Sequence, residues 1–226
     1  MAIKTKTKFE VKEGKTTLTL DHLDEELTFI YPSKGPDTYA NVQEALIKDN
    51  LKAPTASQNA SLIYSAFKNQ DNEFSQNIIN TMKNRWLWCF TGNLYVPDKG
   101  VFIQDNPDIK NNKISMNLED LEKKLEANDS SVRFVPFGYK IQEQTSKQLE
   151  KNQYIIGLAG EEGAQKLAEI ADMYKDKEEP YVYSFENIEK ETARATALDS
   201  YWDRNCLYVD GDCFAAVRNS LAFGVQ

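Results

Sequence analysis

The sequence predicts an α+β fold, in which short strands lie at both ends of the chain and several amphipathic helices lie between them. Polar and apolar residues alternate near both ends, whereas apolar residues three and four positions apart recur in the middle. The chain has 226 residues, of which 41% are hydrophobic and 27% charged, so it can bury a core without disulfides or metals. That length fits one larger domain or two small ones.

The first 38 residues are expected to form an N-terminal β segment. Residues 4–12, 16–20 and 27–31 alternate or are rich in β-branched and aromatic side chains, and Gly14 and the cluster from Pro32 to Pro36 mark turns. From Tyr39 the period changes to that of a helix. Apolar stripes predict three helices, around residues 42–46, 62–67 and 74–82.

The middle of the chain begins with an aromatic-rich segment at residues 85–97, which predicts a buried strand with a bulge at Gly92. A strand at 101–103, a helix at 117–127 and a strand at 131–136 are expected to follow. Residues 154–163 suggest a strand and a glycine-rich turn that opens a helix. Glu161 and Glu162 would repel a phosphate at that helix start, so we interpret them as an acidic helix entry.

Charge and cysteine content exclude several classes of function. The net charge of −8 works against binding to phosphate backbones, so no nucleic-acid partner is expected. No apolar run reaches the roughly 20 residues that span a bilayer, and the start of the chain does not resemble a signal peptide, so we expect a soluble protein. Cys89, Cys206 and Cys213 form no zinc-binding pattern, although a Cys206–Cys213 disulfide remains open.

The composition changes abruptly near the C-terminus. Lys, Glu, Gln and Met together account for 56 of the 226 residues, yet none occurs among the 34 residues from 192 to 225, where the average density would place about ten. These amino acids, with Trp, cannot be reached when only the adenines of an asparagine codon are replaced. Across residues 200–226 only Trp202 and Gln226 fall outside the accessible set.

A strand-like alternation is superposed on this composition. Leu207 and Val209 alternate with Tyr208 and Asp210, and residues 221–225 form a compact apolar strand. We therefore expect one set of side chains to hold the scaffold while the interleaved set faces the solvent. The predicted exposed residues are Tyr201, Tyr208, Asp210, Asp212 and Phe214, and the predicted buried residues are Trp202, Leu207, Val209 and Phe223.

With this tail the sequence resembles the variable proteins of diversity-generating retroelements, in particular their archaeal and viral branch. The resemblance spans about residues 195–226 and includes the terminal Ala222-Phe223-Gly224-Val225-Gln226. It implies that residues 1–226 form a single C-type-lectin-like domain with an irregular C-terminal sheet. It also implies a variable region at residues 192–226 in which adenine positions are rewritten. The calcium-binding motifs and paired disulfides of sugar-binding lectins are absent from the sequence, so calcium-dependent sugar binding does not carry over.

The resemblance predicts a binding protein rather than an enzyme, without a cofactor or metal. Its partner would be an unknown protein or surface ligand, and display on a virion or cell surface would require another protein. Aromatic and arginine side chains give most interface energy, which favours Tyr201, Tyr208, Phe214 and Arg218 as anchors. Arg218 could instead pair with one of the tail aspartates. The predicted variable surface comprises Asp199, Tyr201, Asp203, Asn205, Tyr208, Asp210, Asp212, Phe214, Ala216, Arg218, Asn219 and Ser220.

An oxidase of the formylglycine-generating type is the alternative. Such enzymes resemble lectins and hold copper between two cysteines near the C-terminus, which invites comparison with Cys206 and Cys213. Thiolates suit Cu(I), but the spacing does not match. A divalent-metal site at Asp210-Gly211-Asp212 is a weaker option, because calcium needs about six oxygen ligands. His22, the sole histidine, has no assigned catalytic partner.

Overall fold

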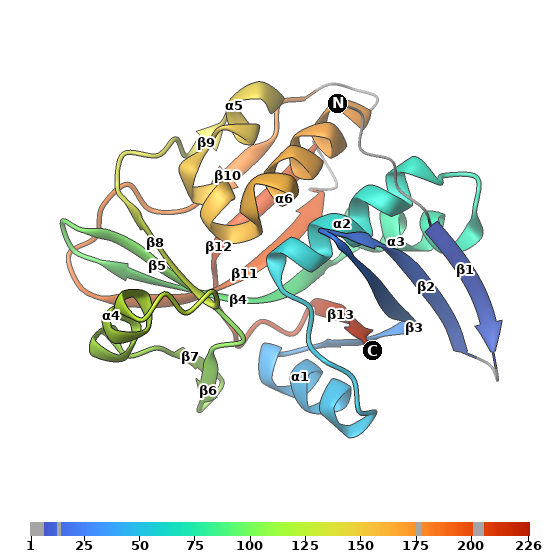
Figure 1. Ribbon diagram of the computed structural model, residues 1–226, viewed down its shortest axis with the longest axis horizontal. Helices are drawn as coiled ribbons and strands as arrows, with labels where there is room; N and C mark the ends of the chain where they lie inside the picture. Colours follow the sequence, from blue (N-terminus) through green and yellow to red (C-terminus); the bar gives the residue numbers. More distant parts are fainter. Residues whose placement is uncertain (1–6, 13–14, 175–177, 201–205) are drawn as a thin grey trace.

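The computed structural model describes residues 7–12, 15–174, 178–200 and 206–226, and a mixed sheet dominates this part of the chain (Figure 1). Its strands follow the order β1-β2-β3-β13-β4-β11-β12-β10-β9, and β5 pairs with both β4 and β8. The β13–β4 and β10–β12 pairs are parallel. The C-terminal strands therefore lie at the centre of the sheet, between strands from the first half of the chain and from the region before the tail.

The strands and helices have the following bounds. The strands are β1 Thr7–Lys12, β2 Lys15–His22, β3 Glu25–Asp37, β4 Trp86–Val96, β5 Gly100–Asp105, β6 Asp108–Lys110, β7 Lys113–Ser115, β8 Val132–Pro136, β9 Gln142–Glu143, β10 Tyr181–Tyr183, β11 Thr192–Ser200, β12 Leu207–Cys213 and β13 Ser220–Val225. The helices are α1 Tyr39–Lys48, α2 Ala56–Lys68, α3 Glu73–Asn84, α4 Leu118–Glu126, α5 Ser146–Glu150 and α6 Gln153–Met173.

The N-terminal strands form a meander, and β3 continues beyond the end that the sequence predicts. Its pairing with β2 stops at Tyr31, next to Pro32, which lacks an N–H for the ladder. The strand nevertheless runs on to Asp37 because β13 pairs with its other edge. The expected end at Pro32 was therefore wrong, since a partner from the other end of the chain supports the strand.

The three helices expected after Tyr39 are confirmed, and local signals set their starts. Thr38, Thr55 and Asn72 cap α1, α2 and α3 by accepting a hydrogen bond from a backbone N–H of the first turn. At α2, Gln58 also returns a bond to the backbone N–H of Thr55, which completes a capping box. The helix starts are thus encoded by the residues directly before them.

Residues 154–159 are helical rather than a strand, which corrects the sequence interpretation. Asn152 caps the N-terminus of α6. The apolar residues Tyr154, Ile155 and Leu158 of this helix are all buried, and their spacing is that of one helix face. The helix is interrupted at Gly160, whose φ of 73° lies in the left-handed region that favours glycine. The expected helix entry at Glu161 and Glu162 therefore corresponds to the second half of a broken helix.

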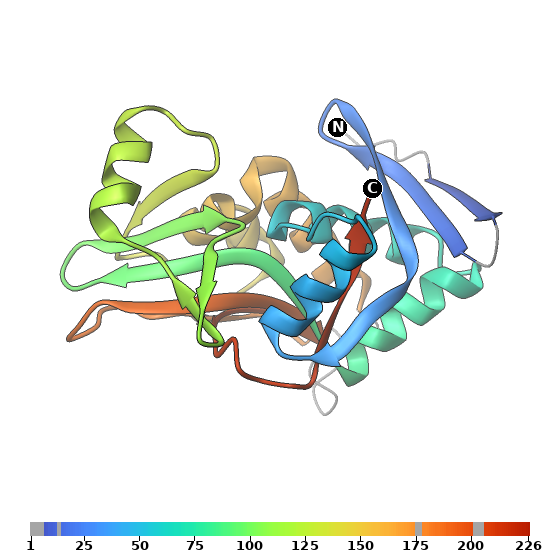
Figure 2. The same cartoon turned by 90° about the horizontal axis from the view of Figure 1, so that it is seen from below.

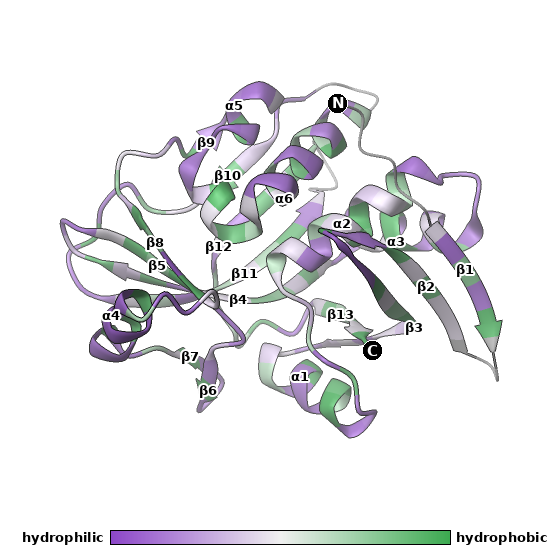
Figure 3. Cartoon of the chain, in the orientation of Figure 1, coloured by the Kyte–Doolittle hydropathy of each residue, from purple (hydrophilic) through white to green (hydrophobic). Residues whose placement is uncertain are grey.

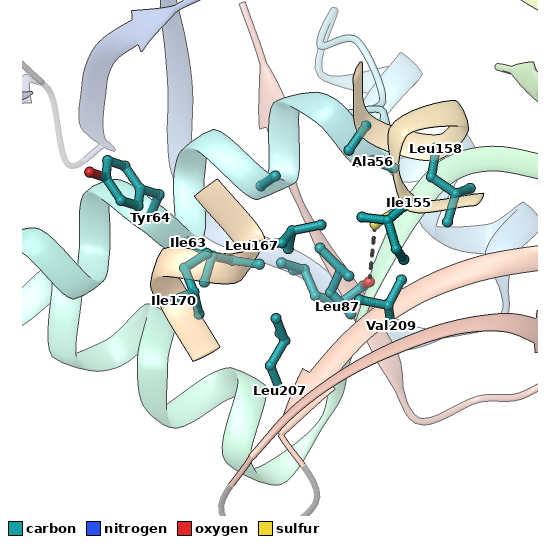
Figure 4. Packing of buried hydrophobic residues seen from close by; sticks show 14 of the residues in the cluster. Ala56, Ile63, Tyr64, Leu87, Ile155, Leu158, Leu167, Ile170, Leu207 and Val209 are labelled. Atoms are coloured by element: carbon teal, nitrogen blue, oxygen red, sulfur yellow. Dashed lines mark hydrogen bonds between the residues drawn. The ribbon is translucent and has the colours of Figure 1, made fainter. Parts of the chain in front are cut away.

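Strand β4 is buried on both faces and separates two parts of the core. Leu87 and Cys89 face α2, α3 and α6, whereas Trp88 and Phe90 lie on the other side with α1. The register against β11 shifts beside Gly92, where the sequence predicts a bulge. Figure 4 shows the larger part of the core, where side chains of β12 and β4 meet those of α2 and α6, among them Ala56, Ile63, Leu87, Ile155, Leu158, Leu167, Ile170, Leu207 and Val209.

Peripheral elements complete the fold. Helix α4 carries purple and green residues together in Figure 3, as expected for an amphipathic helix at the surface, and it buries Leu121. The sequence interpretation missed α5, the β6–β7 hairpin, β9 and β10, which are five residues long or shorter. Within the described residues, no helix is both long and apolar enough to span a membrane.

Candidate ligand-binding surface

The residues that hold the tail in the core are those predicted from the alternation. Leu207, Val209 and Phe223 are 0%, 1% and 2% exposed. Leu207 and Val209 point toward Ile155 and Leu167 of α6 in Figure 4, and Val209 pairs in register with Leu198 of β11. Burial of these residues is confirmed, whereas Trp202 lies outside the described residues.

A buried polar network fixes β12 to the scaffold. The backbone carbonyl of Gly211 accepts hydrogen bonds from the Tyr95 hydroxyl at 3.0 Å and from the Asn93 amide at 3.3 Å. The Tyr154 hydroxyl donates to Asn93 Oδ1 at 3.1 Å. A Cβ atom at Gly211 would lie 1.7 Å from that hydroxyl. The close approach of β12 to Tyr154 of α6 at this position therefore requires glycine. Satisfied buried networks of this kind rigidify a structure.

Tyr208 is buried, not exposed as the alternation predicts. Only 3% of its surface is accessible, because β10 lies against β12 and places two tyrosines beside it. The rings of Tyr181 and Tyr183 stack on that of Tyr208, each with centroids 5.6 Å away. The alternation correctly separates Tyr208 from the helix-facing side chains, but it cannot reveal that a neighbouring strand covers the second face.

Two acidic residues of the predicted surface are withdrawn from solvent. Asp199 is 6% exposed, and burial, together with the nearby Asp210 charge, raises its pKa to about 8. Burial also raises the pKa of Asp210, although the backbone N–H of Asp212 donates to its carboxylate at 2.8 Å and opposes that rise. The prediction that Asp210 is mostly exposed was therefore wrong, since this side chain is half-buried.

Asp199 lines a small cavity of about 80 Å³ between the end of α3 and the end of β11. Trp86, Ser200 and Asn219 contribute to its wall, and the buried Ser200 hydroxyl has no hydrogen-bond partner among the described residues. A cavity of this volume holds only a few water molecules. It is too small to receive more than a single side chain of a ligand.

Among the described residues of the tail, exposure is concentrated in the segment between β12 and β13, the red coil in Figure 2. Phe214 is 61% exposed, as predicted, and Ala216, Arg218 and Asn219 are also exposed, whereas Ser220 is 0% exposed. The predicted site residues Tyr201, Asp203 and Asn205 lie outside the described part of the chain. The structure thus brings Phe214, Ala216, Arg218 and Asn219 onto one short surface segment.

Arg194 organises this surface. Its Nε donates to Asp212 Oδ1 at 2.7 Å, and its guanidinium lies 4.3 Å from the centroid of the Phe214 ring. Asp212 is half-buried in this ion pair, not mostly exposed as expected. Among the described residues, the arginine that pairs with a tail aspartate is Arg194. Arg218 instead lies near Asp37, and its charge is one of the influences that lower the pKa of that carboxyl, after hydrogen bonds from Thr38 and Asn41.

A larger cavity opens beside Phe214. We call it the Phe214 groove; its volume is about 420 Å³, within the range of small-ligand sites. Apolar walls come from β7 and from the residues around Phe214, and three exposed charged residues, Lys113, Lys190 and Glu191, also line it. These charged residues and the β10 tyrosines lie outside the tail. The alternating run Tyr181-Val182-Tyr183 after Pro180 could have predicted the strand that carries these tyrosines.

The cysteines do not form the site that the copper-oxidase alternative requires. Cys206 precedes β12 and Cys213 ends it, so an extended strand places them roughly 20 Å apart. Two thiolates on one metal ion must each lie about 2.3 Å from it, and a disulfide needs similar proximity. All three cysteines are buried and outside any disulfide, and burial raises the pKa of Cys89 to about 12. This geometry excludes both the shared copper site and the Cys206–Cys213 disulfide.

No group of three metal-ligating side chains is present within the described ranges. His22, which the sequence left without a partner, shares the Ser61 hydroxyl with Lys166, whose Nζ donates to it at 2.8 Å. Ser61 and Lys166 are 2% and 1% exposed, and Lys166 also pairs with Glu162. This cluster joins β2 to α2 and α6. It offers no accessible nucleophile.

Comparison with known proteins supports the C-type lectin fold. The chain is similar to a solved structure from Nanoarchaeota, in which the C-type lectin fold accommodates massive sequence variation. The TM-score is 0.58 and the sequence identity is 13%. The match covers 86% of this chain and 98% of the other. No protein-family model matches the sequence, and no curated protein does. The protein thus has the C-type lectin fold, which is an α+β fold.

Proposed function

We propose that the chain is a ligand-binding protein, not an enzyme, whose C-terminal surface is diversified by retroelement-directed adenine mutagenesis. The observation that carries this proposal is a coincidence of boundaries. The run without Lys, Glu, Gln or Met begins at Thr192, where β11 begins, and ends at Val225, where β13 ends. The altered composition therefore coincides with one structural unit, the three C-terminal strands and their connections.

Packing supports a division of this unit into a fixed frame and a changeable surface. The helix-facing residues of β12 and the polar network at Gly211 hold the strands in place, so exposed residues can change without reorganising the core. A rigid frame also lowers the ordering cost of binding. The similar structure from Nanoarchaeota is described as accommodating massive sequence variation, which agrees with such a division.

The genome provides the direct test of diversification. We expect a reverse-transcriptase gene beside this gene, and a near-repeat of its 3′ end whose differences coincide with adenines of the repeat. Related copies of the gene should differ most within the codons for residues 192–226. An equal rate of difference along the whole gene would contradict the proposal.

Two matched libraries test the division into frame and surface. The first randomises residues 214, 216, 218 and 219 to the adenine-accessible amino acids, and the second does the same at residues 207, 209, 221 and 223. We expect most members of the first library to fold and few of the second, because only the second removes buried apolar side chains. The measurement is the fraction of soluble, protease-resistant variants. Similar fractions would contradict the assignment of frame and surface.

A further inference from the structure

The Phe214 groove combines an apolar wall with an exposed aromatic ring. Ile114 of β7 and Ala215 are 7% and 5% exposed, and Ala193 lines the groove beside them. Phe214 stands next to this wall with 61% of its surface accessible. An exposed phenylalanine beside apolar side chains favours contact with an apolar group of a ligand.

The groove is positively charged in an acidic protein. Its lining includes three cations, Lys113, Lys190 and Arg194, and one anion, Glu191. Because Arg194 is paired with Asp212, the two lysines and Glu191 leave a net excess of one positive charge. The net charge of the whole chain is −8. Neither lysine amine forms an ion pair with any described residue. A local excess of positive charge is therefore available to a ligand.

Arg194 is positioned to bind a carboxylate. Its Nε is held by Asp212 at 2.7 Å, its Nη1 donates to the Ala193 carbonyl at 3.0 Å, and its planar group stacks over Phe214. These contacts fix the side chain while Nη2 makes no hydrogen bond to the described residues. A fixed guanidinium loses little conformational entropy when it binds an acid.

We propose that the Phe214 groove binds an acidic segment of a partner protein, with its carboxylates at Lys113, Lys190 and Arg194 and an apolar side chain against Phe214. This inference rests on the proposed binding function and names its ligand class. Lys113 and Lys190 lie outside residues 192–226, so they stay constant while Phe214 and Ala216 change. The constant lysines supply a shared attraction for acidic partners, and the variable side chains supply selectivity among them.

Binding of a labelled peptide tests the proposal. The probe is a short fluorescent peptide of alternating glutamate and leucine, measured by anisotropy against the full chain at low and physiological salt. We expect the double variant Lys113→Glu, Lys190→Glu to bind about tenfold more weakly, with a smaller salt dependence. Phe214→Ala should weaken binding about fivefold. The control, Lys147→Glu with Lys151→Glu on and beside α5, makes the same change in net charge outside the groove.

Each outcome decides the proposal. The proposal is supported if the groove double variant binds the peptide more weakly while the control double variant binds it normally, and if thermal unfolding is unchanged in both. It is overturned if the unaltered protein does not bind the peptide, if the control variant loses as much affinity, or if an oligodeoxynucleotide of similar charge binds equally well. The genomic test is independent of this one. If the genome shows a diversified tail but the peptide does not bind, only the proposal for the Phe214 groove is rejected. If the peptide binds but the genome shows no diversification, only the proposal of diversification is rejected.

Discussion

Strand β12 and the segment that follows it, residues 214–219, share one unusual composition but differ in burial. In β12 one face is covered by α6, and on the other face Tyr208 is covered by the tyrosines of β10 while Asp210 and Asp212 are half-buried. In the following segment Phe214, Ala216, Arg218 and Asn219 are exposed. The comparison teaches that the missing amino acids mark the whole C-terminal unit, whereas burial decides which of its residues can contact a ligand.

The largest expected effect is a contrast in stability between these two regions. Leu207→Ala should lower the free energy of unfolding by about 3 kcal/mol, because it leaves a cavity among fully buried side chains. Phe214→Ala should change it by less than about 0.5 kcal/mol, because the ring is mostly in solvent. Urea denaturation of both variants measures the contrast. Equal losses would mean that the segment after β12 is part of the core.

Tyr208 sharpens the same comparison from within β12. Tyr208→Ala should cost about 2 kcal/mol, because it removes a buried ring that stacks on Tyr181 and Tyr183. Tyr208→Phe keeps the ring and is the matched control, with an expected cost below about 1 kcal/mol. A negligible loss for the alanine variant would show that β10 does not cover this face in solution.

The buried carboxyl of Asp199 predicts a pH dependence. Because its folded-state pKa is raised from 3.8 to about 8, the folded protein retains a proton that the unfolded chain releases. The contribution of Asp199 to the free energy of unfolding is therefore fully present below about pH 4 and decreases as the pH rises to 8. Asp199→Asn should remove this decrease, which for a single group is at most about 1.4 kcal/mol per pH unit, and should therefore be more stable than the unaltered protein at pH 8, relative to pH 5. Asp172→Asn, at an exposed position of α6, controls for the charge change.

The smallest effect is expected at His22, far from the tail. Burial, followed by the charge of Lys166, lowers its pKa from 6.5 in the folded state. Its contribution to stability is present above pH 6.5 and is lost as the pH falls below that value. His22→Gln should flatten this acid limb in thermal unfolding measured between pH 5 and 7. An unchanged acid limb would assign the pH dependence to other groups.

Local patterns predicted much of the fold, whereas contacts between distant segments decided what the sequence could not provide. Helices α1 to α3 were predictable because their caps and apolar stripes lie within a few residues of one another. The extension of β3 beyond Pro32 was not, because it depends on pairing with β13. Residues 154–159 were misassigned because a short apolar run followed by glycine fits either a strand or a buried helix.

The candidate site shows the same limit. Alternation correctly assigned Leu207, Val209 and Phe223 to the core and Phe214 to the surface. It failed for Tyr208 because β10, a strand of three residues, supplies the cover. The lysines of the Phe214 groove were not predictable, because one begins β7 and the other precedes β11, and only folding brings them beside residues 213–216.

Gly211 limits which substitutions a mutating enzyme could introduce into this protein without destroying its fold. No side chain fits at this position, because even a methyl group would overlap the Tyr154 hydroxyl. Every glycine codon starts with two guanines, so if the template repeat also encodes glycine here, a process that rewrites only template adenines leaves the amino acid unchanged. The genetic code would thus protect the one residue of β12 whose replacement the architecture tolerates least, and lethal members of the repertoire would be avoided before translation.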